Sequence, residues 1–189
     1  METRDRILEV AQELVTTVGA NAMSYQHIAD AIGIRKPSIH HYFPTKDALI
    51  EALIERYSVH FFELVDGILA SKKNGAGKLR EFIGLFEGTL KQGAHEQCCA
   101  MGMLGAEVLT LNEAAAASVR QFFVHSEKRV TAILEAGRRD GSLRFEGTAE
   151  HLAGMILAML EGELLIARTR KQPGHFRTAT DPLLGLIES

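Results

Sequence analysis

The segment from Ser24 to Lys46, SYQHIADAIGIRKPSIHHYFPTK, constrains the fold most, because it predicts two short helices separated by a turn. Ser24 is an N-cap residue type, and Gly33 stands where the first helix should end, since glycine enters the left-handed conformation at little cost. Pro37 is tolerated in the first turn of the second helix, where its missing N–H would have no partner. Helices this short bury little surface alone. We therefore expect a helix-turn-helix over residues 24–43, held by neighbouring helices.

Polar and apolar side chains separate within this segment. Ile28, Ala29 and Ile32 fall on one face of the first helix, and Ile39, Tyr42 and Phe43 give the second helix an inward face. The remaining side chains are rich in hydrogen-bond donors, which suits a helix that enters the DNA major groove. They are Arg35, Lys36, Ser38, His40, His41 and Lys46.

Helical periodicity along the rest of the chain predicts an all-α fold of about nine helices. We expect a small helix-turn-helix head over residues 1–46 and a larger helical body over residues 47–189. A long helix from Lys46 to about Ser71 would begin the body, followed by a loop at residues 72–77. The other helices are predicted over residues 3–18, 78–91, 98–109, 112–139 and 148–169, and from 175 or 182 onward.

Composition and charge limit the possible functions. The chain of 189 residues is 46% hydrophobic, which is enough for a real core. No secretory signal and no membrane-spanning run is evident, so we expect a cytoplasmic protein that does not contact a membrane. The formal net charge is −3, and residues 1–46 contain five basic and five acidic groups. Only bases occur between Gly33 and Lys46, however, so a local positive edge remains possible.

The runs SYQHIA (24–29), AIGI (31–34) and PSIHHYFPTKDAL (37–49) resemble the N-terminal signature of the tetracycline-repressor (TetR) family of transcriptional regulators. The similarity is close over residues 3–56 and extends further only as an order of helices. His27 and Arg35 depart from the usual pattern, and Arg35 stands where a small N-capping residue is common.

The resemblance implies a DNA-reading role for the second short helix. Carried over by position, it implies that Lys36, Pro37, Ser38 and His40 face base edges and that His41 contacts a base or a phosphate. It implies phosphate contacts from Ser24, Tyr25, Tyr42 and Lys46. Arg35, at the start of the same helix, joins these candidates.

The resemblance also implies a homodimer and a small-molecule effector. The helix predicted over residues 148–169 is apolar around much of its circumference, so it is the candidate dimer interface, through Leu152, Met155, Ile156, Met159, Leu160 and Leu164. An effector cavity among the middle helices would be lined by Phe61, Phe62, Phe82, Phe86, Cys99, Met103, Phe122, His125, Met155 and Met159. The expected function is a ligand-responsive repressor that a small molecule releases from a palindromic operator.

The segment from His95 to Leu104 keeps alternatives open. Cys98 and Cys99 could form a thiol sensor, or Cys98 could bind metal together with His95, but the leading interpretation is that small polarizable residues pack here beside a ligand cavity. A regulator on the same fold that responds through these thiols or a metal is the alternative function. We find no catalytic motif, so an enzyme is a distant alternative, and we expect no cofactor and no metal.

Overall fold

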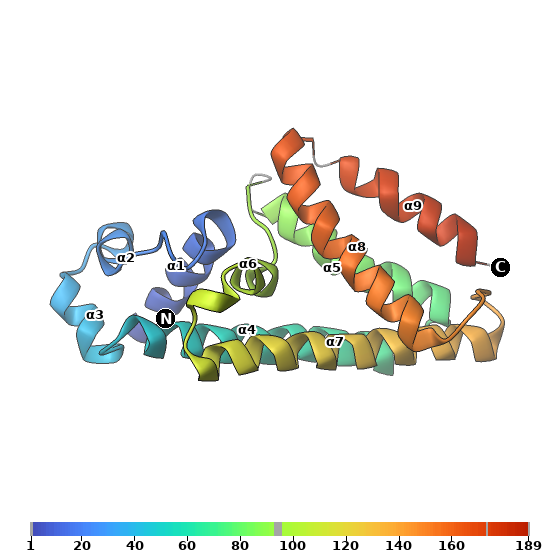
Figure 1. The fold of residues 1–189 in the computed structure, drawn as a ribbon, viewed down its shortest axis with the longest axis horizontal. Helices are drawn as coiled ribbons and strands as arrows, with labels where there is room; N and C mark the ends of the chain where they lie inside the picture. Colours follow the sequence, from blue (N-terminus) through green and yellow to red (C-terminus); the bar gives the residue numbers. More distant parts are fainter. Residues whose placement is uncertain (1, 93–95, 173, 189) are drawn as a thin grey trace. The chain divides into compact units, whose positions relative to one another are not determined.

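The structure, a computed structural model, describes residues 2–92, 96–172 and 174–188. Within these ranges it contains nine α-helices, one short 3-10 helix and no strand (Figure 1). The expected all-α class is confirmed. The helices are α1 (Thr3–Val18), α2 (Tyr25–Ile32), α3 (Lys36–Tyr42), α4 (Lys46–Ala70), α5 (Gly75–Gln92), α6 (Ala100–Ala106), η1 (Val108–Thr110), α7 (Glu113–Asp140), α8 (Ala149–Arg170) and α9 (His175–Ile187).

The chain divides into two compact units. The head unit comprises Met1–Val59 and Ala100–Phe122, and the body unit comprises His60–Cys99 and Phe123–Ser189. The head unit extends past the expected boundary at residue 46 to Val59, and it also includes α6, which packs against α1. Helices α4 and α7 each contribute one part to either unit.

Local sequence signals explain the helix-turn-helix within the head unit. The Ser24 hydroxyl accepts a hydrogen bond from the amide of His27 at 3.2 Å, which caps α2. Gly33 adopts φ 72° at the end of α2, the left-handed conformation expected there. The Thr45 hydroxyl accepts from the amide of Ala48 at 3.1 Å and caps α4. The helices converge on a fully buried set that includes Ile7, Leu8, Ala11, Val15, Ile28, Ile39 and Leu49, each at most 1% exposed.

The body unit is built around α8, which contacts both α5 and α9 (Figure 1). Its buried side chains include Phe82 of α5 and Phe176 of α9, both 0% exposed. Apolar residues of α8 recur at spacings of three and four toward this core, as an amphipathic helix requires. They are Ala153, Ile156, Leu157, Leu160, Leu164 and Ala167.

The beginning of α5 corrects the expected loop at residues 72–77. Helix α5 starts at Gly75, and the Asn74 side-chain oxygen accepts from the amide of Gly77 at 2.9 Å. A Cβ atom on Gly75 would lie 2.0 Å from the Cα atom of Gly137, so α5 and α7 meet through two glycines. Gly75 therefore serves close packing at the start of a helix, whereas the sequence predicted a loop.

Candidate DNA-binding and effector sites

Helix α3 presents almost all of its side chains to solvent. Ile39 is 0% exposed and anchors the helix, whereas the side chains predicted to read DNA are exposed. Pro37 lies in the first turn, and Arg35 at the N-cap position makes no side-chain capping bond. The exposed predicted residues on and beside α3 are Arg35, Lys36, Pro37, Ser38, His40, His41 and Tyr42. A short helix held by one apolar anchor leaves its donors available to a nucleic acid.

Tyr42 differs from the inward position that the hydrophobic pattern suggested. Its side chain is 41% exposed, and its ring centroid lies 5.3 Å from that of His41. Phe43, in contrast, is 3% exposed and belongs to the core. The exposed Tyr42 hydroxyl is therefore free of the core and suits the phosphate contact that the family resemblance implied.

Tyr25 requires a correction, because its hydroxyl is already used inside the head unit. The oxygen lies 2.8 Å from the carbonyl oxygen of Phe43 and 2.6 Å from that of Thr45. The residue is 7% exposed, and burial, followed by the nearby Asp47 charge, raises the pKa of the hydroxyl. A phenol has a single proton to donate, so in this arrangement none is left for a phosphate. Tyr25 instead ties α2 to the start of α4.

Lys46, which is half-buried, and His40, which is exposed, each make a contact within the head unit. The Lys46 ammonium donates to the carbonyl oxygens of Met23 at 2.7 Å and Asn21 at 3.4 Å. The Nδ1 atom of His40 lies 3.3 Å from the carbonyl oxygen of Pro44, and its ring packs edge-on against Tyr25 at 4.8 Å. An ammonium has three protons. Lys46 can therefore keep one of these bonds and still donate to a phosphate.

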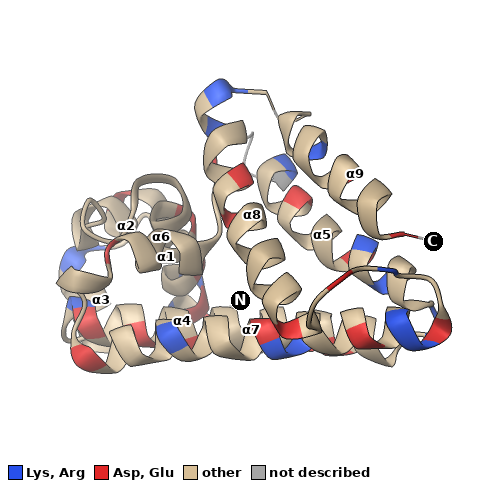
Figure 2. Ribbon diagram, turned by 45° about the vertical axis from the view of Figure 1, so that its right-hand side comes forward, with Lys and Arg blue, Asp and Glu red and all other residues tan. Residues whose placement is uncertain are grey.

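Basic and acidic side chains of the head unit gather on different helices. Figure 2 shows Lys and Arg at the beginning of α3, and Asp and Glu along the first turns of α4. The bases are Arg35 and Lys36, and the acids are Asp47, Glu51 and Glu55. The basic side chains expected after Gly33 therefore lie at the beginning of α3 and, with Lys46, at the first residue of α4.

Four of the predicted effector-site residues form one aromatic cluster in the body unit. The ring of Phe61 lies 5.8 Å from Phe62 and 6.3 Å from both Phe82 and Phe86, measured between centroids. Phe82 and Phe86 lie 5.5 Å apart. His125 is exposed, and its ring lies 6.0 Å from Phe62. These contacts are edge-on or tilted, as aromatic rings prefer.

The other predicted effector-site residues do not join this cluster as a set. Met103 and Phe122 belong to the head unit, where Phe122 packs against Tyr57 at 5.9 Å. Met155 is 68% exposed, so it lies on the surface of the chain. Cys99 is buried and hydrogen-bonded to Glu161 of α8, and Met159 is half-buried.

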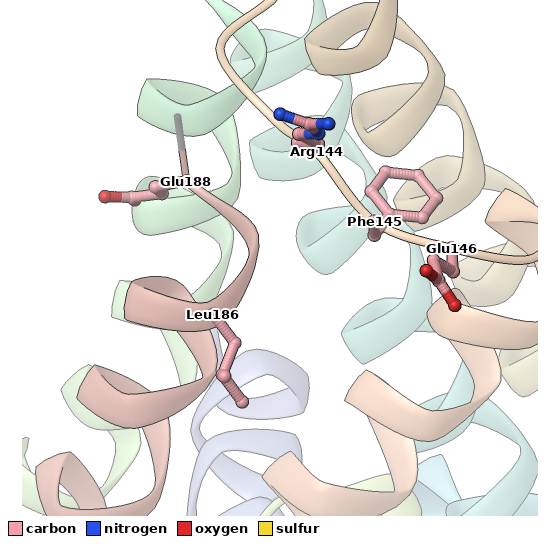
Figure 3. A pocket seen from close by; sticks show the side chains of 5 residues that line it. All are labelled: Arg144, Phe145, Glu146, Leu186 and Glu188. Carbon is pink, nitrogen blue, oxygen red and sulfur yellow. The ribbon is translucent and has the colours of Figure 1, made fainter.

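A cavity in the body unit lies elsewhere. It has a volume of about 590 Å³ and is lined by residues of the α7–α8 connection and of the end of α9 (Figure 3). None of the ten predicted lining residues borders it. The lining residues are Arg144, Phe145, Glu146, Leu186 and Glu188. With two acids, one base and two apolar side chains, it lacks the apolar character expected of the effector cavity.

The two cysteines are held by polar side chains of α8. The Cys99 thiol hydrogen-bonds the carboxylate of Glu161, and the Arg168 guanidinium lies 3.7 Å from the sulfur of Cys98. Both cysteines are at most 3% exposed. Burial raises the pKa of the Cys98 thiol, against the opposing effect of Arg168. A raised pKa and low access disfavour the thiolate, so this geometry does not favour the thiol-sensor alternative.

Glu161 is a further functional candidate, which the sequence patterns did not identify. Burial raises the pKa of its carboxyl from 4.5 to about 7. On the other side of α8, one carboxylate oxygen of Glu163 is buried without a hydrogen bond, and His175 lies 3.8 Å away. The signal available in the sequence was the presence of two acids in an otherwise apolar helix.

Helix α8 has two apolar faces, which divides the predicted dimer residues. Ile156, Leu160 and Leu164 are at most 1% exposed within the subunit, so they belong to its own core. Their assignment to a partner-facing surface is corrected. The opposite face carries Met155, Ala158, Met159, Gly162, Leu165 and Ile166 at helical spacing. Leu152 and Met159 are half-buried.

Two further findings concern the ranges that the structure describes. No group of three or more His, Cys, Asp or Glu side chains is placed there to hold a metal ion. His95, the proposed metal partner of Cys98, lies outside those ranges. No described helix is long and apolar enough to cross a membrane.

The head unit begins with three helices, and the third, α3, exposes side chains that donate hydrogen bonds. This arrangement defines a helix-turn-helix DNA-binding regulator. The sequence matches the family described as bacterial regulatory proteins, tetR family, over residues 7–53. It also matches the LmrA/YxaF-like C-terminal domain of transcriptional regulators over residues 76–181. The chain therefore belongs to the TetR family of bacterial transcriptional regulators.

Individual members of this family are similar to this protein over nearly the whole chain. A TetR-family regulator from Agrobacterium tumefaciens has a similar structure, with a TM-score of 0.93, 32% identity and coverage of 98% of this chain and 97% of the other. The repressor NemR of Escherichia coli is 26% identical, with coverage of 88% of this chain and 84% of NemR. The regulator AcuR of Cereibacter sphaeroides is 24% identical, with coverage of 92% and 80%.

Proposed function

We propose that this protein is a cytoplasmic, ligand-responsive repressor that binds a palindromic operator as a homodimer. The observation that carries the proposal is the exposure of the donors on α3, a helix in which Ile39 is the buried residue. The relative NemR, described as an HTH-type transcriptional repressor, supports repression as the outcome. One short helix reads only a few base pairs, so two copies about one DNA turn apart are needed for a specific site.

Base reading is assigned to Lys36, Ser38 and His40, and phosphate contacts to Tyr42, Lys46 and Ser24. The lysine donates to guanine edges, the hydroxyl serves several edges, and Pro37 can touch a thymine methyl. Because residues 1–46 are neutral overall, bulk attraction to DNA contributes little. Discrimination then depends on base contacts and on the spacing of the two heads.

The dimer surface is assigned to the outer face of α8. Met155, Leu165 and Ile166 are 68%, 49% and 41% exposed, and they lie on one helical stripe. Leu186 of α9 is 81% exposed. Apolar side chains exposed at regular spacing are costly in water and suit a second copy of the chain.

The effector is assigned to the body unit, at the cluster of Phe61, Phe62, Phe82 and Phe86. Aromatic side chains suit an apolar small molecule, and His125 beside Phe62 can supply one polar contact. The dimer would have two conformations, one in which the spacing of the two heads fits the operator and one in which it does not. Such a molecule releases the protein from DNA only to the extent that it binds the second conformation more tightly than the first.

Operator binding tests the proposal directly. Lys36→Ala and Tyr42→Ala are each expected to weaken binding to a palindromic operator fragment by about tenfold, since each removes one contact per half-site. Fluorescence anisotropy with labelled DNA at fixed salt measures the change. Lys72→Ala, which removes an exposed lysine of the α4–α5 loop, is the matched control and should bind normally. Unchanged binding by both α3 variants would refute the assignment.

The dimer assignment has its own test. Met155→Glu places a charge on the outer face of α8 and is expected to raise the dimer dissociation constant by about tenfold or more. Analytical ultracentrifugation over a concentration series measures it. Leu109→Glu, at a side chain that is 97% exposed in the head unit, should leave association unchanged. If the two variants behave alike, the interface lies elsewhere.

A further inference from the structure

We propose that His40 presents a hydrogen-bond acceptor, its Nε2 atom, to the operator, and so selects adenine or cytosine on the strand that it faces. The inference deepens the proposed function and rests on it, because it gives a preferred base to a residue which that function assigns to base reading. A neutral imidazole has one nitrogen that donates and one that accepts. The position of its hydrogen therefore decides which bases it can bind.

The hydrogen of the neutral His40 ring is placed on Nδ1 by a contact within the head unit. This atom lies 3.3 Å from the carbonyl oxygen of Pro44. A carbonyl oxygen can only accept, so Nδ1 is the donor of this bond. Nε2 then keeps a lone pair. In the part of the chain that the structure describes, no group hydrogen-bonds Nε2 of His40, so this lone pair is available to a donor from DNA.

Tyr25 supports the His40 ring in this position. The two ring centroids lie 4.8 Å apart at an interplanar angle of 61°, an edge-on contact. Tyr25 is itself fixed, because it is 7% exposed and its hydroxyl lies 2.8 Å and 2.6 Å from the carbonyl oxygens of Phe43 and Thr45. A half turn of the His40 ring about its bond to Cβ would place a carbon atom against the Pro44 oxygen and lose that bond. The contacts therefore favour one orientation of the ring.

His40 lies on the same face of α3 as Lys36. The two residues are four positions apart, and side chains at this spacing are neighbours on a helix surface. Both are exposed, whereas Ile39 is 0% exposed and belongs to the core. A docking of α3 that brings Lys36 to a base edge therefore brings His40 toward the same groove.

An acceptor in the major groove pairs with an amino group. The amino groups presented there are N6 of adenine and N4 of cytosine, whereas guanine and thymine offer acceptors alone. Opposite guanine or thymine, the Nε2 lone pair of His40 would meet another lone pair. Lys36 has the reverse preference, because an ammonium only donates. Helix α3 thus carries a donor and an acceptor one turn apart, and the acceptor distinguishes the two orientations of a base pair.

Nuclear magnetic resonance of the free protein tests the position of the hydrogen. Two-bond nitrogen–proton correlation spectra of isotope-labelled protein, at about pH 8 where an ordinary imidazole is neutral, identify the ring nitrogen that carries it. The signals of His40 are recognised by their loss in His40→Ala. We expect the hydrogen on Nδ1. Hydrogen on Nε2 would overturn the proposal, because that atom would then donate to the base.

Site selection at the same pH identifies the base pair that His40 reads. Wild type and His40→Ala each select sites from a randomised DNA library, and one pair in each half-site should lose selectivity in the variant. Base analogues then remove one group at this pair. Purine for adenine, or pyrimidin-2-one for cytosine, removes the amino group. In the partner base, 5-methylpyrimidin-2-one for thymine, or 2-aminopurine for guanine, removes the exocyclic oxygen.

The analogues separate an acceptor from a donor at His40. Loss of the amino group should weaken binding of the wild type about fivefold more per half-site than binding of His40→Ala, which is the effect of one neutral hydrogen bond. Loss of the oxygen should weaken both proteins equally. The change in base pairing cancels between the two proteins, as in a double-mutant cycle. Lys72→Ala, at an exposed lysine of the α4–α5 loop, is the control and should respond as the wild type does.

Three outcomes distinguish this inference from the function on which it rests. Coupling of His40 to the oxygen in place of the amino group, or no pair that loses selectivity, would overturn the inference and leave DNA binding intact. Failure of the wild type to select any palindromic site would instead refute the proposed function. His40→Phe keeps a ring against Tyr25 without a nitrogen, and it replaces His40→Ala if alanine disturbs the fold of the head unit.

Discussion

Replacing Phe82 with alanine is expected to lower the free energy of unfolding by about 3–5 kcal/mol. The side chain is 0% exposed, and its ring contacts the rings of Phe61 and Phe86 at 6.3 and 5.5 Å. Truncation removes this buried apolar surface and leaves a cavity that packed helices fill only in part. Because the chain has no tryptophan, guanidinium unfolding followed by far-ultraviolet circular dichroism is the suitable measurement.

Phe145 provides the comparison for this prediction. It is half-buried in the α7–α8 connection, where the Arg138 guanidinium lies 4.0 Å from its ring centroid. Phe145→Ala should cost about 1 kcal/mol, because an exposed cation–π contact and partial burial contribute little. Both variants are measured at one protein concentration, since association stabilises the folded state. If Phe82→Ala costs no more than Phe145→Ala, the aromatic cluster is not packed as core.

The head was predictable because its determinants are local. Capping by Ser24, the left-handed Gly33 and the proline in the first turn of α3 each act within a few residues, and each signal is written in the sequence. The contacts of Tyr25, in contrast, could not be predicted from local signals. Its hydroxyl is taken by carbonyl groups 18 and 20 residues away, and no local pattern reveals such a partner.

The body was predictable as helices but not as surfaces. Helix α8 is apolar on two sides, and hydrophobic periodicity alone cannot tell a core face from a partner-facing one. Only packing against α5 and α9 separates Leu160, which is buried, from Met155, which is exposed. Gly75 illustrates the same limit, since its close partner Gly137 lies on another helix.

The charge state of Glu161 could not be read from sequence, because it depends on burial rather than on neighbouring residues. The titration of Glu161 is expected to make the stability of the protein depend on pH. The pKa of the folded carboxyl is about 7, above its ordinary value of 4.5, and burial is the main cause. Between these two pH values the folded state keeps a proton that the unfolded state has lost. Stability from this group is therefore fully present below pH 4.5, falls as pH rises to 7, and changes little above that.

Glu161→Gln removes this dependence. Relative to the wild type, the variant is expected to gain stability progressively between pH 5 and pH 8, by up to about 3 kcal/mol, as a shift of this size implies. Unfolding in guanidinium at several pH values measures the difference between the two proteins, in which the titration of all other groups cancels. Glu150→Gln, at an exposed glutamate in the first turn of the same helix, should give a difference independent of pH over this range. A constant difference for Glu161→Gln as well would mean that water reaches the carboxylate, and that α8 carries an ordinary charge beside Cys99.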